Sequence, residues 1–452
     1  MDTALSKRMF EGRRFHLVAG LLIALATFLV YSNTFHAGFH FDDTGSILED
    51  YTLRNLDNLS RILQGNRGLA RATFALNYAV GGLNVAGYHI VNLAIHITNG
   101  ILVYFLVFLT LIRIDSLKDR AKRIAIYTAL LFAVHPIQTQ AVTYIVQRME
   151  ILASMFMLAG LLLFIKGSEA AKIYARVLLY GAVAVSYLLG FFSKEVAITL
   201  PAIVFLYDWC FLAKGAMKKV AARLPLYLVL IAMLAFFVTR SLPGLQEIPG
   251  GSTVGFGVQG REPITSLEAG QQQAGSTDLG FQNISPKGYA FTQFNVLIYY
   301  ITLLFVPVNQ NLDYDFPISK GLFDIPLVKE GTVLNIPIPP PIVSLIILLA
   351  IIGFAVYQIL KRTTDDNALI YDTPLPSLPL KGGGLGWGCC QRSLIAFFIL
   401  WFFIILSPTS GFIPIIDVIF EHRLYLASVG FFVIFSFTLD SLFEYLEHRR
   451  RL

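Results

Sequence analysis

Two adjacent carboxylates, Asp42 and Asp43, follow the first hydrophobic segment of the chain by only a few residues. A carboxylate beside a membrane surface can deprotonate a hydroxyl group. Basic side chains recur at the ends of other hydrophobic segments, where they could hold a phosphate that becomes a leaving group. The residues that we expect to bind phosphate are Arg148, Lys194, His422 and Arg423. Together these residue types suit a transfer reaction on a phosphate-bearing lipid.

A second set of polar residues could support this chemistry. Its members are His89, His135, Glu150, Glu195, Glu421 and Tyr425. His89, Asn92 and His96 stand at i, i+3 and i+7, so they share one face of a helix. Plainer interpretations remain open for these residues. The polar face can bond neighbouring helices, Arg148 and Glu150 can form a structural pair with each other or with a neighbour, and Lys194 with Glu195 can form a solvated turn.

The composition is that of a membrane protein. The 452 residues are 56% hydrophobic and only 14% charged, and the mean hydropathy is +0.65. Apolar runs recur from near residue 15 to near residue 443, and each is long enough to cross roughly 30 Å of hydrocarbon as a helix. The fold class is therefore an all-α polytopic membrane protein. The net charge of +6 comes from short basic clusters between the apolar runs, which orient a membrane protein and do not predict nucleic-acid binding.

The basic clusters predict the topology. Residues 15–33 are interpreted as a retained first span with a cytoplasmic N-terminus, which places Asp42 and Asp43 outside. Lys361 with Arg362, and the basic residues 448–451, are expected inside. Both of these basic clusters can lie on the cytoplasmic side only if residues 291–307 do not cross the membrane completely. We therefore predict ten full spans and one re-entrant or interfacial helix, in preference to eleven spans.

The predicted transmembrane domain covers residues 1–443. It includes two large outer loops, at 35–85 and 241–290, and the first of these contains a short amphipathic helix on the membrane interface. Residues 363–392 form a low-complexity Pro/Gly insert that we expect to be cytoplasmic, and residues 444–452 form a basic cytoplasmic tail. The three cysteines, Cys210, Cys389 and Cys390, have neither disulfide-framework nor metal-ligand spacing.

Several ordered segments carry a resemblance to a known family. They are Phe41-Asp42-Asp43, Phe74 to Tyr78, Tyr88 to Leu93, His135 to Tyr144, Ser193 to Pro201 and Arg423 to Phe431. With these segments the chain resembles a C-type (GT-C) glycosyltransferase of the transmembrane-and-tetratricopeptide-repeat O-mannosyltransferase family and its bacterial relatives. The resemblance implies a GT-C helical bundle, a polyprenyl-phosphate sugar donor, an inverting transfer and a base in the first outer loop. Asp42 matches the leading acid of the paired-acid motif, with Asp43 supporting it or exchanging roles with it.

The resemblance also sets the expected partners. The sugar is a mannose-like hexose, and the acceptor is a hydroxyl group of a protein, a lipid or a glycan on the outer membrane face. We expect no cofactor with a monophosphate donor, whereas a diphosphate donor would call for a divalent cation. The expected location is a bacterial inner membrane with the site on the periplasmic side. Two departures stand out: the family's repeats do not follow the membrane part, and the usual Arg-Pro of the first loop reads Arg67-Gly68.

Two other classes of protein are considered. A secondary transporter would carry protons on buried acids and histidines near mid-membrane and would show internal repeats, whereas the charges here fall at helix ends and no clear repeat is present. An inactive glycosyltransferase-like scaffold is the second alternative, because the repeats are missing. Transfer from a polyprenyl-phosphate sugar distinguishes both from the enzyme.

Overall fold

The computed structural model describes residues 2–241, 284–326, 338–371, 389–412, 414–415 and 417–450, with side chains at 12–239, 284–326, 338–361, 391–412, 414–415, 417–447 and 449–450. Most of the predicted outer loop at 241–290 and most of the predicted insert at 363–392 lie outside the described residues. The same holds for the last two residues of the predicted tail.

The described residues form helices and connecting loops without a strand. The main helices are α1 (Asp2–Tyr31), α4 (Val85–Leu111), α5 (Ala121–Val134), α7 (Arg148–Glu169), α8 (Ile173–Phe191), α9 (Leu200–Tyr207), α11 (Leu224–Ser241), α12 (Pro286–Phe305), α13 (Pro341–Tyr371), α14 (Cys389–Leu406) and α15 (Leu424–Arg450). In the described part, eight helices are long and apolar enough to cross a membrane, and Leu224–Thr239 and Gln391–Leu406 are shorter apolar helices. The chain is a multi-pass membrane protein, as the sequence predicts.

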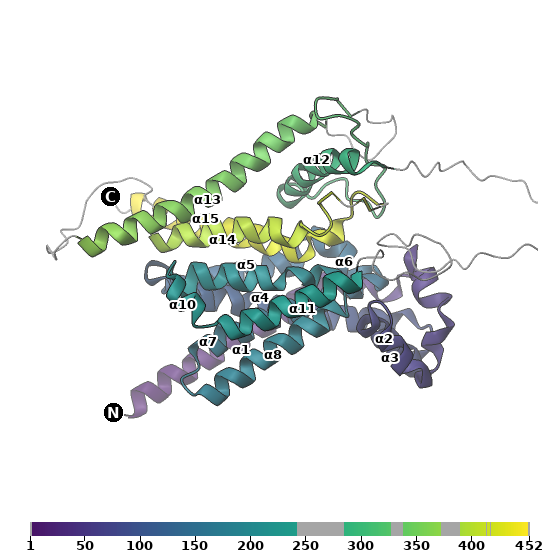
Figure 1. The fold of residues 1–452 in the computed structure, drawn as a ribbon. Coiled ribbons are helices and arrows are strands. Elements are labelled where there is room, and N and C mark those ends of the chain that lie inside the picture. Colours follow the sequence, from purple (N-terminus) through teal and green to yellow (C-terminus); the bar gives the residue numbers. More distant parts are fainter. Residues whose placement is uncertain are drawn as a thin grey trace, which may run out of the picture.

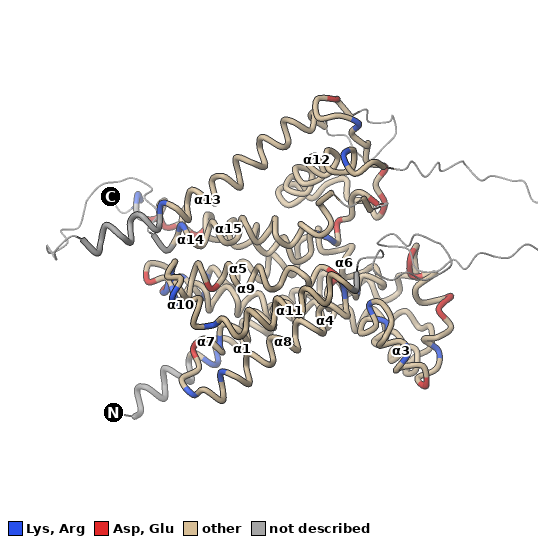
Figure 2. Tube along the Cα trace, viewed as in Figure 1, with Lys and Arg blue, Asp and Glu red and all other residues tan. Residues whose placement is uncertain are grey.

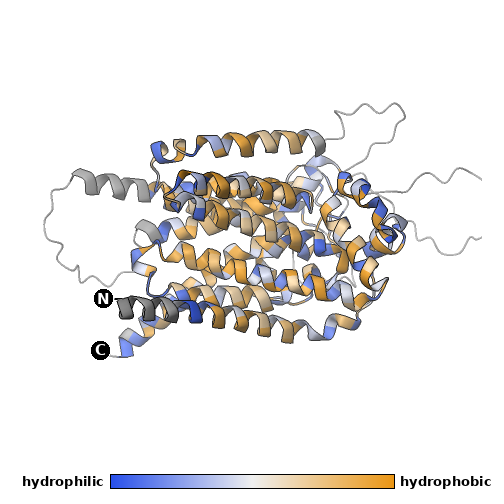
Figure 3. Cartoon of the chain, turned by 90° about the horizontal axis from the view of Figure 1, so that it is seen from below, coloured by the Kyte–Doolittle hydropathy of each residue, from blue (hydrophilic) through white to orange (hydrophobic). Residues whose placement is uncertain are grey.

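The helices lie side by side in one bundle (Figure 1). α4, α7 and α15 are mostly buried in it, whereas α1, α8 and α13 keep most of their apolar surface exposed. Leu21 on α1 and Leu178 on α8 are 70% and 73% exposed, which is the pattern of side chains that face lipid. Figure 3 shows hydrophobic residues along the helices and hydrophilic residues toward their ends.

Residues 37–84 cover one end of the bundle, which we call the capped end. Here α2 (Leu59–Gln64) and α3 (Gly68–Gly81) pack on a small core that includes Leu53, Ile62 and Phe74. The amphipathic helix predicted in this loop is short, and Ile62 belongs to that core while Leu63 stays exposed. Both termini lie at the opposite end of the bundle (Figure 1).

Helix α12 begins and ends at the capped end. Near its start, the Tyr289 hydroxyl donates to the Thr409 carbonyl at 2.6 Å. Just after its end, the Gln310 side chain donates to the Pro136 carbonyl at 3.2 Å. Thr409 follows α14 and Pro136 follows α5, so both acceptors belong to loops at the capped end. α12 is therefore placed as the re-entrant interpretation predicts, although its length and composition would allow it to cross.

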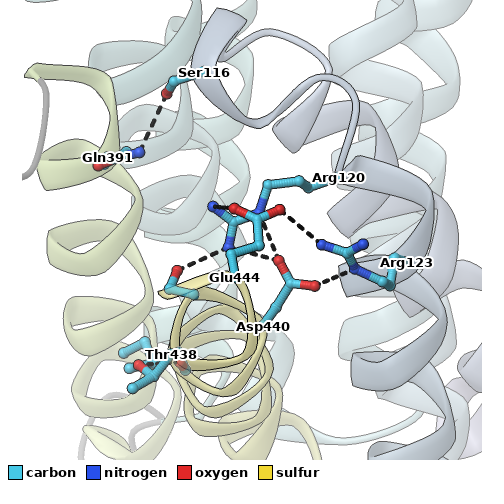
Figure 4. A network of polar contacts seen from close by, with 9 residues as sticks. Ser116, Arg120, Arg123, Gln391, Thr438, Asp440 and Glu444 are labelled. Carbon is cyan, nitrogen blue, oxygen red and sulfur yellow. Dashed lines mark hydrogen bonds and ion pairs between the residues drawn. The ribbon is translucent and has the colours of Figure 1, made fainter. Parts of the chain in front are cut away.

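An ion-pair network joins α5 to α15 at the end opposite the cap (Figure 4). Asp440 is 1% exposed, and its carboxylate pairs with Arg120 at 2.6 Å and with Arg123. Glu444 contacts the same two arginines at 3.0 Å and 2.9 Å. A buried carboxylate is tolerated only when it is paired, so these contacts fix the two helices against each other. Figure 2 shows that charged residues gather at the two ends of the bundle.

Candidate active site

The acidic pair lies on a tight turn at the capped end. Phe41 has a φ of 42°, a left-handed conformation that costs a residue with a side chain about 1–2 kcal/mol. Backbone hydrogen bonds from Asp43 to His40 at 2.9 Å and from Thr44 to Phe41 at 3.0 Å close the turn. The turn sends the two neighbouring carboxylates to different environments, since Asp43 is buried and Asp42 is exposed.

Asp43 fastens the turn to the bundle. Its Oδ2 accepts from the backbone N–H of His40 at 3.0 Å, and its Oδ1 accepts from that of Val146 at 2.7 Å. Val146 lies in the 3-10 turn Ile145–Gln147 that leads into α7. Burial raises the pKa of Asp43 to about 6, although these two N–H groups favour the charged form. Asp43 is therefore a carboxylate that positions its neighbour.

Asp43 gives the protein a specific pH dependence. Its pKa is higher in the folded state than the unfolded value of 3.8, so its favourable contribution is complete below pH 3.8 and is lost as the pH rises through about 6. The shift of about two units corresponds to about 3 kcal/mol. We expect the stability of Asp43→Asn relative to the wild type to rise by up to that amount between pH 4 and pH 7, measured by thermal unfolding across this range. A difference that stays constant with pH would contradict the assignment.

Asp42 is the accessible member of the pair. Its backbone N–H donates to the hydroxyl of Tyr144 at 2.7 Å, and this ring belongs to the small core beneath the cap. Burial, followed by the charge of Asp42, raises the pKa of Tyr144. The side chain of Asp42 thus faces solvent beside a neutral phenol. Of the two acids, Asp42 is exposed and Asp43 is buried.

Two ion pairs line the same end of the bundle. The ammonium of Lys194 contacts Glu150 Oε2 at 2.9 Å and Gln147 Oε1 at 3.1 Å. Burial lowers the pKa of Lys194, and the nearby charge of Glu150 opposes this effect. The adjacent residue, Glu195, accepts from Arg67 through both of its oxygens. The predicted residues Lys194, Glu150 and Glu195 are therefore brought together, and Arg67 is a cation that the sequence analysis did not place in the site.

His422 and Arg423 approach this group from the start of α15. The His422 backbone donates to Gln140 Oε1 at 2.7 Å, and Arg423 donates to the Asp417 carbonyl at 2.8 Å. His422 is within electrostatic range of Lys194, Arg423 and Arg67. Four cationic or imidazole side chains from three separate stretches of sequence thus converge.

Arg148 stands apart from this group. It is fully buried, and its nitrogens donate to Asn92 Oδ1 at 2.7 Å, to Asn77 Oδ1 at 2.6 Å and to the Tyr88 carbonyl at 3.0 Å. Its guanidinium also lies 4.6 Å from the centroid of Phe74. With acceptors on all three nitrogens, Arg148 holds α3, α4 and α7 together, and its guanidinium is already engaged inside the bundle.

Glu421 holds the segment that follows α12. Its carboxylate accepts from the Asn311 backbone at 2.9 Å, from the Gln310 side chain at 2.6 Å and from the hydroxyl of Tyr314. Gln140 donates to the carbonyl of Leu312 at 2.9 Å in the same segment. Both carboxylate oxygens of Glu421 thus accept hydrogen bonds, which hold residues 310–314 in place.

The remaining predicted residues are also engaged in internal contacts. His89 bonds the Ala37 carbonyl at 3.0 Å, which ties α4 to the start of the cap. His135 accepts from the Ile137 backbone at 3.2 Å and so begins the turn after α5. Tyr425 bonds His96 at 2.7 Å inside the bundle. These contacts match the plainer interpretation of the polar face of α4, in which polar residues connect helices.

Backbone strain is concentrated around the site. Among the described residues other than glycine, four have left-handed backbones: Phe41, Arg67, Lys214 and Asn309. Phe41 precedes Asp42, Arg67 pairs with Glu195, and Asn309 precedes the residues that bind Glu421. Such strain persists where the surroundings hold it, and it clusters at functional sites. Three of the four positions therefore mark the same end of the bundle, independently of any motif.

The described residues contain no group of three or more His, Cys, Asp or Glu that could hold a metal ion. Asp417 is within electrostatic range of Asp42 and of Asp313. The prediction that a divalent cation takes part only with a diphosphate donor stays a prediction.

The chain is similar to curated O-mannosyltransferases over part of its length. It is 34% identical to the protein O-mannosyl-transferase TMTC3 of Mus musculus over 212 residues, which cover 43% of this chain and 22% of that protein. It is 33% identical to the human TMTC3 over 217 residues, which cover 44% and 22%, and 28% identical to the Drosophila melanogaster Tmtc3 over 223 residues, which cover 43% and 24%. The match thus spans less than a quarter of each relative. No family model matches the chain, and no solved structure matches it. The resemblance predicted from the sequence is confirmed over about two fifths of the chain.

Proposed function

We propose that this membrane protein, which resembles protein O-mannosyltransferases over 43% of its length, transfers a mannose-like hexose from a polyprenyl phosphate to a hydroxyl acceptor. The observation that carries the proposal is an exposed Asp42, held by its buried neighbour and by Tyr144, beside a converging group of cations. A soluble enzyme has no counterpart to the lipid-facing helices that surround this group. The names of the relatives support mannose as the sugar and a protein hydroxyl as the acceptor.

The reaction is a single displacement. Asp42 accepts the proton of the acceptor hydroxyl while that oxygen attacks the anomeric carbon. The bond between the anomeric carbon and the phosphate oxygen breaks, and its electron pair stays on the phosphate. Lys194 and Arg423 stabilise the charge that develops on the leaving phosphate, and His422 lies within electrostatic range of both. Attack from the face opposite the leaving group inverts the anomeric configuration.

The proposed orientation follows from charge and topology. Arg13 and Arg14 lie in the first half of α1, and Arg120 and Arg123 pair with Asp440 near the end of α15. Both termini lie at the same end of the bundle (Figure 1), and basic residues favour the cytoplasmic side. The capped end then faces outward, into the periplasm if the membrane is a bacterial inner membrane. Charges at the two ends of the bundle support an enzyme at the membrane surface over a transporter with acids at mid-membrane.

Turnover of a defined donor tests the function. Purified full-length protein, given a synthetic polyprenyl-phosphate mannose and a Ser/Thr-rich peptide, is expected to release polyprenyl phosphate and to give a mannosylated peptide, both detected by mass spectrometry. Polyprenyl-diphosphate mannose serves as the matched donor control, with and without Mg²⁺. Absence of turnover with peptide, lipid and glycan acceptors alike would favour the inactive-scaffold alternative.

A further inference from the structure

We infer that Arg67 binds the phosphate of the donor lipid, a role that rests on the proposed function and that the sequence did not assign. Arg67 is the most accessible of the candidate cations. Its side chain is 32% exposed and that of Lys194 is 13% exposed, and the residues Arg423 and Arg148 are both buried. A phosphate that arrives from outside the bundle meets Arg67 before it meets the others.

One edge of the Arg67 guanidinium is already fixed. Nε contacts both oxygens of Glu195, at 3.0 Å and 3.1 Å, and Nη2 contacts Oε2 at 3.0 Å. The remaining nitrogen, Nη1, contacts the sulfur of Met149 at 3.6 Å, and a thioether is only a weak acceptor. The fixed edge orients the group, and the Nη1 edge keeps donors for an anion. Arginine is suited to this division because its planar fork presents five N–H donors.

The backbone around Arg67 is built to hold this position. Arg67 has a φ of 50°, and a Cβ on the following Gly68 would lie 2.5 Å from the Leu63 carbonyl. The next residue, Leu69, donates its N–H to the Phe192 carbonyl at 3.0 Å. The start of α3 is thus docked on the end of α8 by the hydrogen bond from Leu69. The left-handed Arg67 and the close contact between Gly68 and Leu63 fix the backbone there. This arrangement places the guanidinium within electrostatic range of both Asp42 and His422.

The positive charge of Arg67 offsets the negative charge of Glu195 beside the proposed phosphate site. Arg67 neutralises Glu195, and Lys194 pairs with Glu150, so these four residues sum to zero. Arg423 donates to backbone carbonyls, and its positive charge lies within electrostatic range of Asp417. Loss of Arg67 would leave Glu195 as an extra negative charge where a phosphate has to bind. Arg67 therefore acts both by direct contact and by cancelling Glu195.

A binding experiment separates phosphate contact from a structural role. The affinity of the purified full-length protein is measured for polyprenyl phosphate and for the matching polyprenol, which lacks only the phosphate. The variant is Arg67→Met/Glu195→Gln, which removes the ion pair without leaving a buried unpaired charge. We expect its affinity for polyprenyl phosphate to fall about 10- to 100-fold, the worth of one charge-assisted contact, with unchanged affinity for polyprenol. Glu195→Gln alone keeps the guanidinium and is expected to bind polyprenyl phosphate more tightly than the double variant by the same factor.

The control is the pair formed by Arg71 and Asp50 in the same cap. Its side chains are 19% and 14% exposed and its N–O distance is 2.5 Å, so Arg71→Met/Asp50→Asn removes a similar ion pair without touching the site. Equal affinity of wild type and Arg67→Met/Glu195→Gln for polyprenyl phosphate would overturn the inference, as would a parallel loss of polyprenol binding. If the wild type itself does not distinguish polyprenyl phosphate from polyprenol, the proposed donor fails and this role fails with it.

Discussion

Replacing Asp42 by asparagine is expected to lower the transfer rate by about 10²- to 10⁴-fold, the usual contribution of a general base. Asparagine has nearly the same shape but cannot accept the acceptor's proton. The fold is expected to stay intact, because the bond from residue 42 to the Tyr144 hydroxyl comes from the backbone N–H. The rate is measured with saturating donor and acceptor, so that a change in binding does not imitate a change in chemistry.

The matched control is Asp57→Asn. Asp57 is an exposed carboxylate in the same cap, where surface substitutions usually change stability by less than about 0.5 kcal/mol. Its rate should equal that of the wild type. The opposite result would be an Asp42→Asn variant with wild-type turnover and an Asp43→Asn variant that is folded but inactive. In that case Asp43 would be the base and Asp42 the residue that positions it.

Replacing Arg148 by methionine is expected to destabilise the fold by about 3–5 kcal/mol, because breaking a buried charged network leaves its partners unsatisfied. The oxygens of Asn92 and Asn77 and the Tyr88 carbonyl would all lose their donor. The measurement is thermal unfolding of the purified protein at one fixed detergent concentration. Arg61→Met on the exposed side of α2 serves as the control and should unfold with the wild type.

The same variant decides between two roles for Arg148. The sequence alone allowed it to bind the donor phosphate or to hold helices together. If Arg148→Met unfolds at the wild-type temperature and yet loses affinity for polyprenyl phosphate, the phosphate role is correct and the structural role is wrong.

The sequence could predict the helices and which loops lie at the same end of the bundle, because these depend on local properties. Apolar runs define spans, and basic clusters define which loops share a face. The same counting predicted that residues 291–307 do not cross, and α12 has both ends at the capped end. These predictions required no knowledge of which helices touch.

The roles within the site could not be predicted in the same way. Lys194 and Glu150 are 44 positions apart on different elements, and spacing along the chain says nothing about such a pairing. The choice between Asp42 and Asp43 depends on a left-handed Phe41, which no propensity favours for an aromatic residue. Arg67 matches the arginine of the usual Arg-Pro, and only the following Gly68 departs from that motif. Its ion pair with Glu195 depends on how the cap packs on the bundle, which the sequence does not indicate.

The contacts between α5 and α15 have a consequence for motion. The two helices are fastened at one end by Arg120 and Arg123 on Asp440, and at the other by a bond of 2.9 Å from Gln138 to Ser428. Two helices held at both ends move as one rigid body, and cannot hinge apart without breaking a buried ion pair. If the capped end rearranges, we expect the motion in the first loop and in residues 307–326, on the microsecond to millisecond scale of loop and domain rearrangements. The far end of the bundle acts as the fixed frame against which they move.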